Sequence, residues 1–106
     1  MNELKNILND IPEKFENEIF DKIITSENFT LERIISNGHN SPENFWYDQE
    51  KNEFVLILKG NAIIKYDDGK IFKMTKGDYL IIPAHQKHRV EETSSEEKTI
   101  WLAIHF

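Results

Sequence analysis

The 106-residue chain has no cysteine, only four glycines and three prolines, and no long apolar run. The lack of cysteine excludes disulfides, thiolate metal ligands and thiol nucleophiles. No segment is apolar enough for a membrane-spanning helix or a signal peptide, so we expect a cytoplasmic protein without membrane contact. Basic residues are also scarce, with 13 Lys and Arg against 19 Asp and Glu. The net charge of −6, without a basic patch, argues against nucleic acid as a partner.

The remaining composition is that of one folded domain. Hydrophobic residues make up 39% of the sequence and aromatic residues 11%, which is too much for a disordered chain and enough for one modest core. The clearest turn is Asp67-Asp68-Gly69, where Asp followed by Gly favours a type I′ hairpin. Short apolar segments between turn residues predict an all-β sandwich or barrel. Its strands are expected at 29–36, 44–48, 54–58, 62–66, 71–74, 79–82, 87–90 and 99–106.

The first 28 residues differ from the rest of the chain. Leu4, Ile7, Leu8 and Ile11 follow helical spacing until Pro12 interrupts it. We therefore predict a short N-terminal helix, followed by a strand at 18–25. The expected organisation is a helix and strand extension over 1–28, packing on a barrel formed by 29–106.

The first segment whose side chains could form a functional site is Trp46-Tyr47-Asp48. It is followed by a four-residue turn and the strand that begins at Glu53. Alternation along a strand puts Trp46 and Asp48 on one face and Glu53 on the same side as Val55. If Asp48 and Glu53 both face inward, two carboxylates converge at one end of the barrel.

The second segment runs from Gly77 through Pro83 to His88. His88 has the parity of Val90, whereas the charged residues around them alternate with both, so we expect the His88 side chain to point inward. The sequence contains no glycine-rich phosphate loop and no Gly-x-Ser-x-Gly elbow. Binding of nucleotides by such a loop and hydrolysis by such a serine therefore have no support.

These two segments resemble the two motifs of the cupin superfamily. The first motif is Gly, five residues, His-x-His, three or four residues, Glu, six residues, Gly. The second is Gly, five residues, Pro-x-Gly, two residues, His, three residues, Asn. The residues that match are Glu53, Gly60, Gly77, Pro83 and His88. Those that depart are Asn40, Trp46, Asp48, His85 and Glu92. The resemblance spans residues 40–92 and implies a double-stranded β-helix, the cupin jelly-roll barrel.

The resemblance also implies a divalent metal, such as Mn, Fe, Zn or Ni, held by three His and one Glu. Glu53 and His88 stand at ligand positions, and Asp48 is a chemically suitable substitute for one missing histidine. His85 is the fourth candidate ligand. Three of the four have a structural alternative: His88 as a core histidine bonded to Asp48 or Glu53, and Asp48 and His85 as turn residues.

Aromatic residues crowd the same region and predict a pocket for a small molecule. The residues expected to line it are Phe45, Trp46, Tyr47 and His105. Two function classes remain open because a fold alone does not decide between them. One is a protein that binds a metal or small ligand in the barrel, with unknown catalytic residues. The other is a metal-dependent dioxygenase, isomerase or decarboxylase acting on a small oxygen-bearing substrate. In either case exposed sheet edges, and the resemblance, favour a homodimer.

Overall fold

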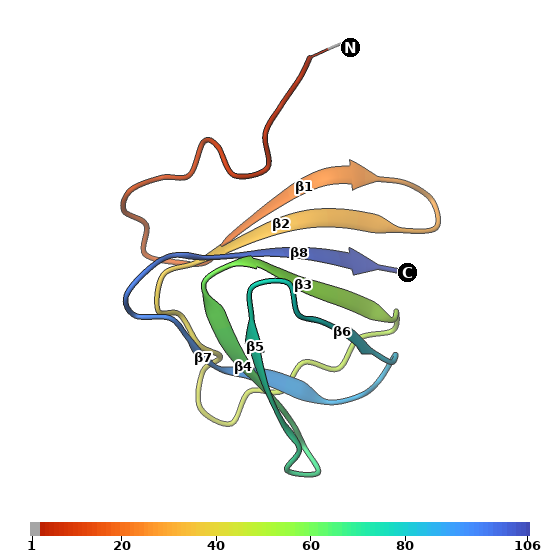
Figure 1. Ribbon diagram of the computed structural model, residues 1–106. Coiled ribbons are helices and arrows are strands. Elements are labelled where there is room, and N and C mark those ends of the chain that lie inside the picture. Colours follow the sequence, from red (N-terminus) through yellow and green to blue (C-terminus); the bar gives the residue numbers. More distant parts are fainter. Residues whose placement is uncertain (1–2) are drawn as a thin grey trace.

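The computed structural model describes residues 3–106, which form two facing antiparallel sheets (Figure 1). The strands are β1 (Ile19–Thr25), β2 (Thr30–Ser36), β3 (Glu53–Lys59), β4 (Asn61–Tyr66), β5 (Ile71–Thr75), β6 (Tyr79–Ile82), β7 (His88–Thr93) and β8 (Thr99–His105). The larger sheet has the order β1-β2-β8-β3-β6 and the smaller sheet the order β5-β4-β7. The prediction of an all-β domain is confirmed.

The hairpin between β4 and β5 forms where Asp68-Gly69 predicts it, but with another turn type. Gly69 N donates to Tyr66 O at 3.0 Å, and Tyr66 N donates to Lys70 O at 2.9 Å. A type I′ turn needs positive φ at both central residues, whereas here Gly69, with φ of 95°, is the turn residue with positive φ. This pattern is that of a type I turn followed by a glycine bulge, in which Asp68 keeps an ordinary backbone conformation.

Alternation along the strands builds the core between the sheets. In β3 the buried positions are Glu53, Val55 and Ile57, with partly exposed residues between them. Buried hydrophobic side chains from both sheets form one cluster, which consists of Ile34, Val55, Ile57, Ala62, Ile64, Tyr66, Met74, Ile82, Trp101 and Ala103. Glu53 and His88 are buried in phase with this cluster, as their parity predicts, so the core contains ionisable groups.

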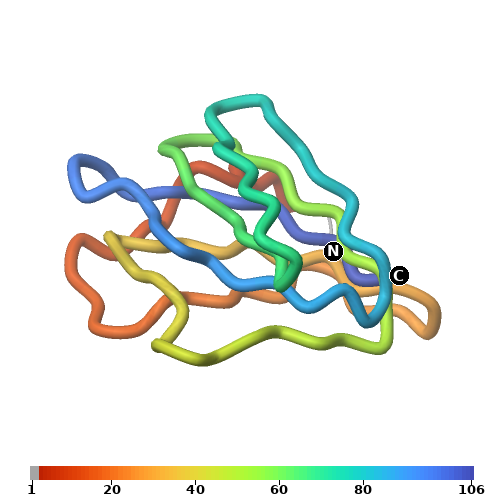
Figure 2. The backbone as a smooth tube through the Cα atoms, turned by 90° about the horizontal axis from the view of Figure 1, so that it is seen from below, coloured from red at the N-terminus to blue at the C-terminus, as the bar shows by residue number. Residues whose placement is uncertain are grey.

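The long connection from β2 to β3 lies beside β7, the edge strand of the smaller sheet (Figure 2). Ser41 N donates to Val90 O at 2.8 Å, and Tyr47 and His88 exchange two backbone hydrogen bonds of 2.7 and 3.1 Å. The strand predicted over 44–48 is reduced to a single bridge at Tyr47. These bonds cover the edge of β7 and fix Tyr47 next to His88.

The predicted N-terminal helix is wrong. Asn6 instead closes an isolated turn, because its side-chain oxygen accepts from Leu8 N at 2.8 Å and its carbonyl accepts from Asn9 N at 3.0 Å. The Arg33 guanidinium donates to the carbonyls of Ile7 at 3.0 Å and Asn9 at 2.6 Å. A helix this short is marginal without packing, and these contacts satisfy the backbone in another conformation.

The strand predicted at 18–25 does form, as β1 at the edge of the larger sheet. It pairs with β2 from Ile19 opposite Ile35 to Thr25 opposite Thr30. Residues before position 29 therefore contribute a strand to the same sheet as β8. Across residues 3–106, no helix has the length and apolar character to cross a membrane.

Candidate functional site

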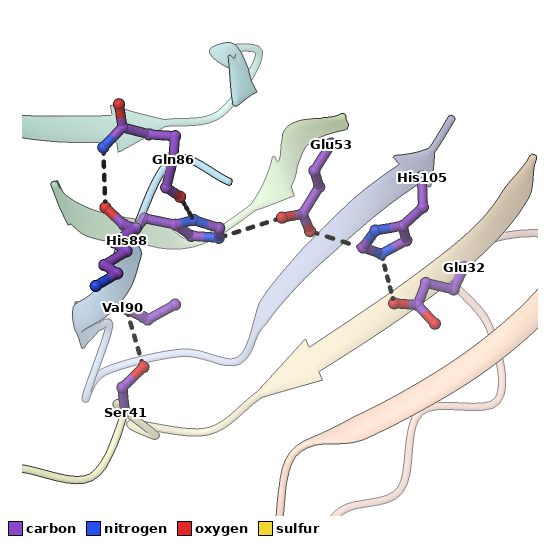
Figure 3. Close-up of polar contacts among 8 residues, drawn as sticks. Glu32, Ser41, Glu53, Gln86, His88, Val90 and His105 are labelled. Atoms are coloured by element: carbon purple, nitrogen blue, oxygen red, sulfur yellow. Dashed lines mark hydrogen bonds and ion pairs between the residues drawn. The ribbon is translucent and has the colours of Figure 1, made fainter. Parts of the chain in front are cut away.

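Three neighbouring strands of the larger sheet place a row of polar side chains side by side. Glu53, at the start of β3, lies opposite His105 of β8, and Thr30 of β2 lies opposite the same His105. Glu32, two residues further along β2, is therefore a diagonal neighbour of His105 on the same face. His105 Nε2 lies 3.3 Å from Glu32 Oε1 and 3.7 Å from Glu53 Oε2 (Figure 3).

His88 of β7 reaches the same carboxylate from the smaller sheet. Its Nε2 lies 3.3 Å from Glu53 Oε1, and its Nδ1 lies 2.8 Å from the carbonyl oxygen of Gln86 (Figure 3). Because a carbonyl only accepts, Nδ1 carries a proton, and the contact of Nε2 with a carboxyl oxygen needs a second one. An imidazole with protons on both nitrogens therefore fits the two contacts of His88.

The surroundings of His88 favour its charged form. Burial alone lowers the pKa of His88, but hydrogen bonds with Glu53 and the Gln86 carbonyl, together with the Glu53 charge, outweigh it. The net pKa therefore lies above the ordinary value of 6.5. The Tyr47 ring stacks on the imidazole, with ring centres 5.4 Å apart and planes 22° apart. This stacking covers one side of the ion pair.

The polar row faces a cavity of about 90 Å³ between the two sheets. Its walls combine apolar and aromatic side chains with ionisable ones. The lining residues are Glu18, Phe20, Glu32, Ile34, Tyr47, Gln49, Glu53, Val55, Ile64, Ile82, His88, Val90, Trp101 and His105. Three carboxylates thus face the cavity, and its described lining contains neither Lys nor Arg. A cavity with apolar walls and a few convergent polar groups is typical of a small-molecule site.

Besides Glu32, two polar groups at this cavity escaped the sequence motifs. Glu18 precedes β1, and its carboxylate accepts a short hydrogen bond from Ser36 Oγ. Gln49 follows the bridge at Tyr47, and its Oε1 is buried without a hydrogen-bond partner among the described residues. An unpaired buried acceptor is unfavourable, and Gln49 is one of the residues that line the cavity.

Of the four predicted ligands, the structure brings only Glu53 and His88 together in the cavity. Asp48 and His85 form a separate pair outside it, with Oδ1 and Nδ1 2.9 Å apart. Their side chains are 44% and 66% exposed, respectively. His85 takes a positive φ of 64°, which directs the chain through a tight turn after Pro83. Asp48 therefore supplies no carboxylate to the buried pair.

The predicted pocket residues are also divided. Tyr47 and His105 line the cavity, whereas Trp46 and Phe45 are not part of its lining. Phe45 is 41% exposed and packs edge-on against Tyr47, with ring centres 4.8 Å apart. Parity with Ile34 along β2 is the signal that could have identified Glu32, because both residues point to the same side of the strand.

The donor set that the resemblance implies for a metal does not assemble here. Within residues 3–106, no group of three or more His, Asp and Glu side chains is arranged to hold a metal ion. Glu53 and His88 are directed at each other, and the carboxylate of Asp48 is engaged with His85 on the surface. A site for Mn, Fe, Zn or Ni would require these pairs to separate and rearrange.

Comparison with known proteins establishes the family. The Cupin domain family matches residues 33–105, which run from within β2 to the end of β8 and include Glu53, His88 and His105 of the polar row. This chain belongs to the cupin superfamily. A solved structure from Ralstonia eutropha, a proposed mannose-6-phosphate isomerase, is 39% identical to this cupin over 97% of this chain and 96% of that one, with a TM-score of 0.93.

More distant cupins share the fold. A cupin superfamily protein from Desulfitobacterium hafniense is 18% identical, with 91% of this chain and 83% of that chain covered and a TM-score of 0.75. An RmlC-like cupin from Desulfovibrio desulfuricans is 17% identical, with 99% and 97% covered and a TM-score of 0.75. No curated protein matches this cupin significantly. The two-sheet arrangement is therefore the jelly-roll barrel of the superfamily.

The raised pKa of His88 predicts that this cupin loses stability as the pH rises. The folded protein binds the His88 proton more tightly than the unfolded chain, so the stabilisation is complete below the unfolded pKa and disappears as the pH passes the folded pKa. Above pH ~6.5, we expect unfolding free energy to fall by up to about 1.4 kcal/mol per pH unit until His88 is neutral. Urea unfolding between pH 6 and 9 measures this slope.

The matched control is His85→Gln, which removes an exposed histidine from the turn that precedes β7. His88→Gln should flatten the pH dependence, whereas His85→Gln should leave it unchanged. Equal slopes in the wild type and His88→Gln would show that another group is responsible.

Proposed function

We propose that this cupin binds a small organic molecule in the cavity between its sheets, without a resident metal ion. The observation that carries the proposal is the cavity itself, with its polar row on one side and apolar walls on the other. The Glu53–His88 pair is held by contacts within the protein, so no ion is needed to compensate its charges. At about 90 Å³ the cavity is small beside the roughly 300–1,000 Å³ of drug-sized sites, which favours an occupant of few heavy atoms.

A metal-dependent dioxygenase, isomerase or decarboxylase is the alternative function. The name of the Ralstonia eutropha relative points to isomerisation of a phosphorylated sugar. The lining of this cavity does not favour such a substrate, because three carboxylates outnumber its two histidines and its described lining contains neither Lys nor Arg. We therefore propose binding of a small ligand as the function of this cupin, and we do not assign it activity on a sugar phosphate. The homodimer and the cytoplasmic location stay predictions.

Thermal unfolding with a library of small polyols, amines and carboxylic acids tests the proposal. A ligand that binds only the folded protein stabilises it by about 2.7 kcal/mol at a hundredfold excess over its Kd. Val90→Phe should remove this stabilisation, because Val90 lines the cavity and the larger ring fills it. Ile71→Phe is the control, since Ile71 is 56% exposed and lies outside the cavity.

Metal analysis of the purified protein tests whether the site is free of a resident metal ion. Protein purified without chelator should contain no stoichiometric metal, and Mn, Fe, Zn or Ni should leave its melting temperature unchanged. Stabilisation by one of these ions that disappears with both a chelator and His88→Gln would overturn metal-free binding. The absence of any library ligand that stabilises the wild type more than Val90→Phe would overturn the binding function itself.

A further inference from the structure

The donors and acceptors that face the cavity are unbalanced. Both nitrogens of His88 are engaged, by Gln86 and Glu53, and His105 Nε2 already faces two carboxylates. Each ionised carboxylate offers about four acceptor sites, and the cavity presents three carboxylates. Gln49 adds a buried carbonyl oxygen that has no partner among the described residues. The open hydrogen-bonding capacity of the cavity therefore lies mainly on the acceptor side.

The cavity is also rich in negatively charged groups. Glu18, Glu32 and Glu53 come from three different strands or their ends and line one space, where the described lining offers only His88 and His105 as cationic groups. Burial raises the pKa of Tyr47, and the charges of Glu18, Glu53 and Glu32 raise it further. The phenol thus lies in the combined negative field of all three carboxylates. An anionic ligand would be repelled there, whereas a cation would be attracted.

The aromatic part of the lining suits a cation as well. Tyr47, Phe20 and Trp101 all border the cavity. The face of an aromatic ring attracts an ammonium group, and the attraction increases when water is excluded. An alkylammonium ion could place its N–H groups on the carboxylates and its carbon chain against the apolar walls.

We propose that the ligand of this cupin is a small protonated primary amine, an inference that rests on the proposed function and assigns its ligand class. Its ammonium group is held by the carboxylates of the polar row, and one N–H donates to Gln49 Oε1. The short alkyl part occupies the apolar side of the cavity, among Ile34, Val55 and Val90.

Three probes of similar shape separate charge from size. n-Propylamine, which is protonated at pH 7, is compared with 1-propanol and propionate. Binding is followed by titration in NMR spectra of the isotope-labelled wild type, using the amide signals of Tyr47, Gln49 and Val90. The amine should cause saturable shifts, with an affinity roughly tenfold or more above that of propanol, and propionate should cause none.

Two variants examine the contacts. Glu32→Gln should weaken amine binding by roughly 10- to 100-fold, because it replaces a charged hydrogen-bond acceptor by a neutral one. Gln49→Met should also weaken binding, yet raise the melting temperature of the ligand-free protein, because it removes a buried acceptor without a partner. Glu27→Gln is the matched control: it removes the same charge from an exposed turn and should leave the affinity unchanged.

The outcomes distinguish the inference from the proposed function. Equal or tighter binding of propanol or propionate at the same amide signals would overturn the amine assignment while leaving a ligand-binding cavity. Failure of the amine to shift these signals at tens of millimolar would also overturn the assignment, and the library screen then decides the proposed function separately. Equal loss of affinity in Glu32→Gln and Glu27→Gln would show that only the overall charge attracts the amine, which would overturn the contacts proposed for the site.

Discussion

Replacement of His88 by leucine is expected to lower the free energy of unfolding by about 3–5 kcal/mol at pH 6, because it leaves a buried carboxylate without its partner. Glu53 and His88 are both nearly inaccessible, with 9% and 7% of their side-chain surfaces exposed. The retained contact of Glu53 with His105 is longer, at 3.7 Å, and does not replace the lost one. Urea unfolding of the two proteins at one pH measures the difference.

His85→Leu provides the control, because it separates the effect of burial from the effect of the distance between the paired groups. The His85–Asp48 contact is shorter, at 2.9 Å, but both side chains are largely exposed. Removing an exposed ion pair changes stability by only about 0–1 kcal/mol. The double variant His88→Leu/Glu53→Leu should recover part of the loss, since no buried charge remains. Equal losses in His85→Leu and His88→Leu would contradict a special role for the buried pair.

Gly60→Ala is expected to destabilise this cupin by about 2–5 kcal/mol, through backbone strain and steric overlap together. Gly60 has a φ of 84°, which a residue with a side chain rarely adopts. A Cβ atom there would lie 2.8 Å from Thr99 Cα and 3.0 Å from Lys98 O. Both are backbone atoms of the segment entering β8, so relief of the overlap would move the strand that carries His105.

Gly69→Ala separates the two contributions. Gly69 also has a positive φ, of 95°, but a Cβ there would meet nothing within 4 Å. Its substitution should show only the conformational part, about 1–2 kcal/mol. Thermal or urea unfolding of both variants gives the comparison, and equal losses would show that the contact with Thr99 is unimportant.

The periodicity of the strands predicts the inner faces of the barrel well. Parity alone places Glu53 with Val55 and His88 with Val90, and both ionisable residues are buried in the structure. The helix predicted at the N-terminus is absent for a physical reason. A short helix with four apolar residues on one face is not stable without a surface to pack against. In the structure Arg33 instead donates hydrogen bonds to the carbonyls of Ile7 and Asn9.

The periodicity of a sequence does not predict which distant strands pair with each other. Glu32 and His105 are 73 residues apart and meet only because β2 and β8 are neighbours in the larger sheet. Sequence parity states which face a residue occupies, but not which strand lies next to it. For this reason the motifs found one end of the polar row, and Glu18, Glu32 and Gln49 were missed.

By itself, the sequence determined an all-β barrel of the cupin type, its turns at glycine, and the inward direction of Glu53 and His88. The all-β class, the turns and the inward direction follow from local chemistry, namely alternation and turn preference, whereas the cupin type follows from the resemblance of the two motifs. Only the tertiary structure decided that Asp48 and His85 pair outside the cavity while His105 and Glu32 extend the row within it. The reason is that a loop residue such as His85 takes its direction from the backbone turn, and a row across a sheet exists only once its strands are paired.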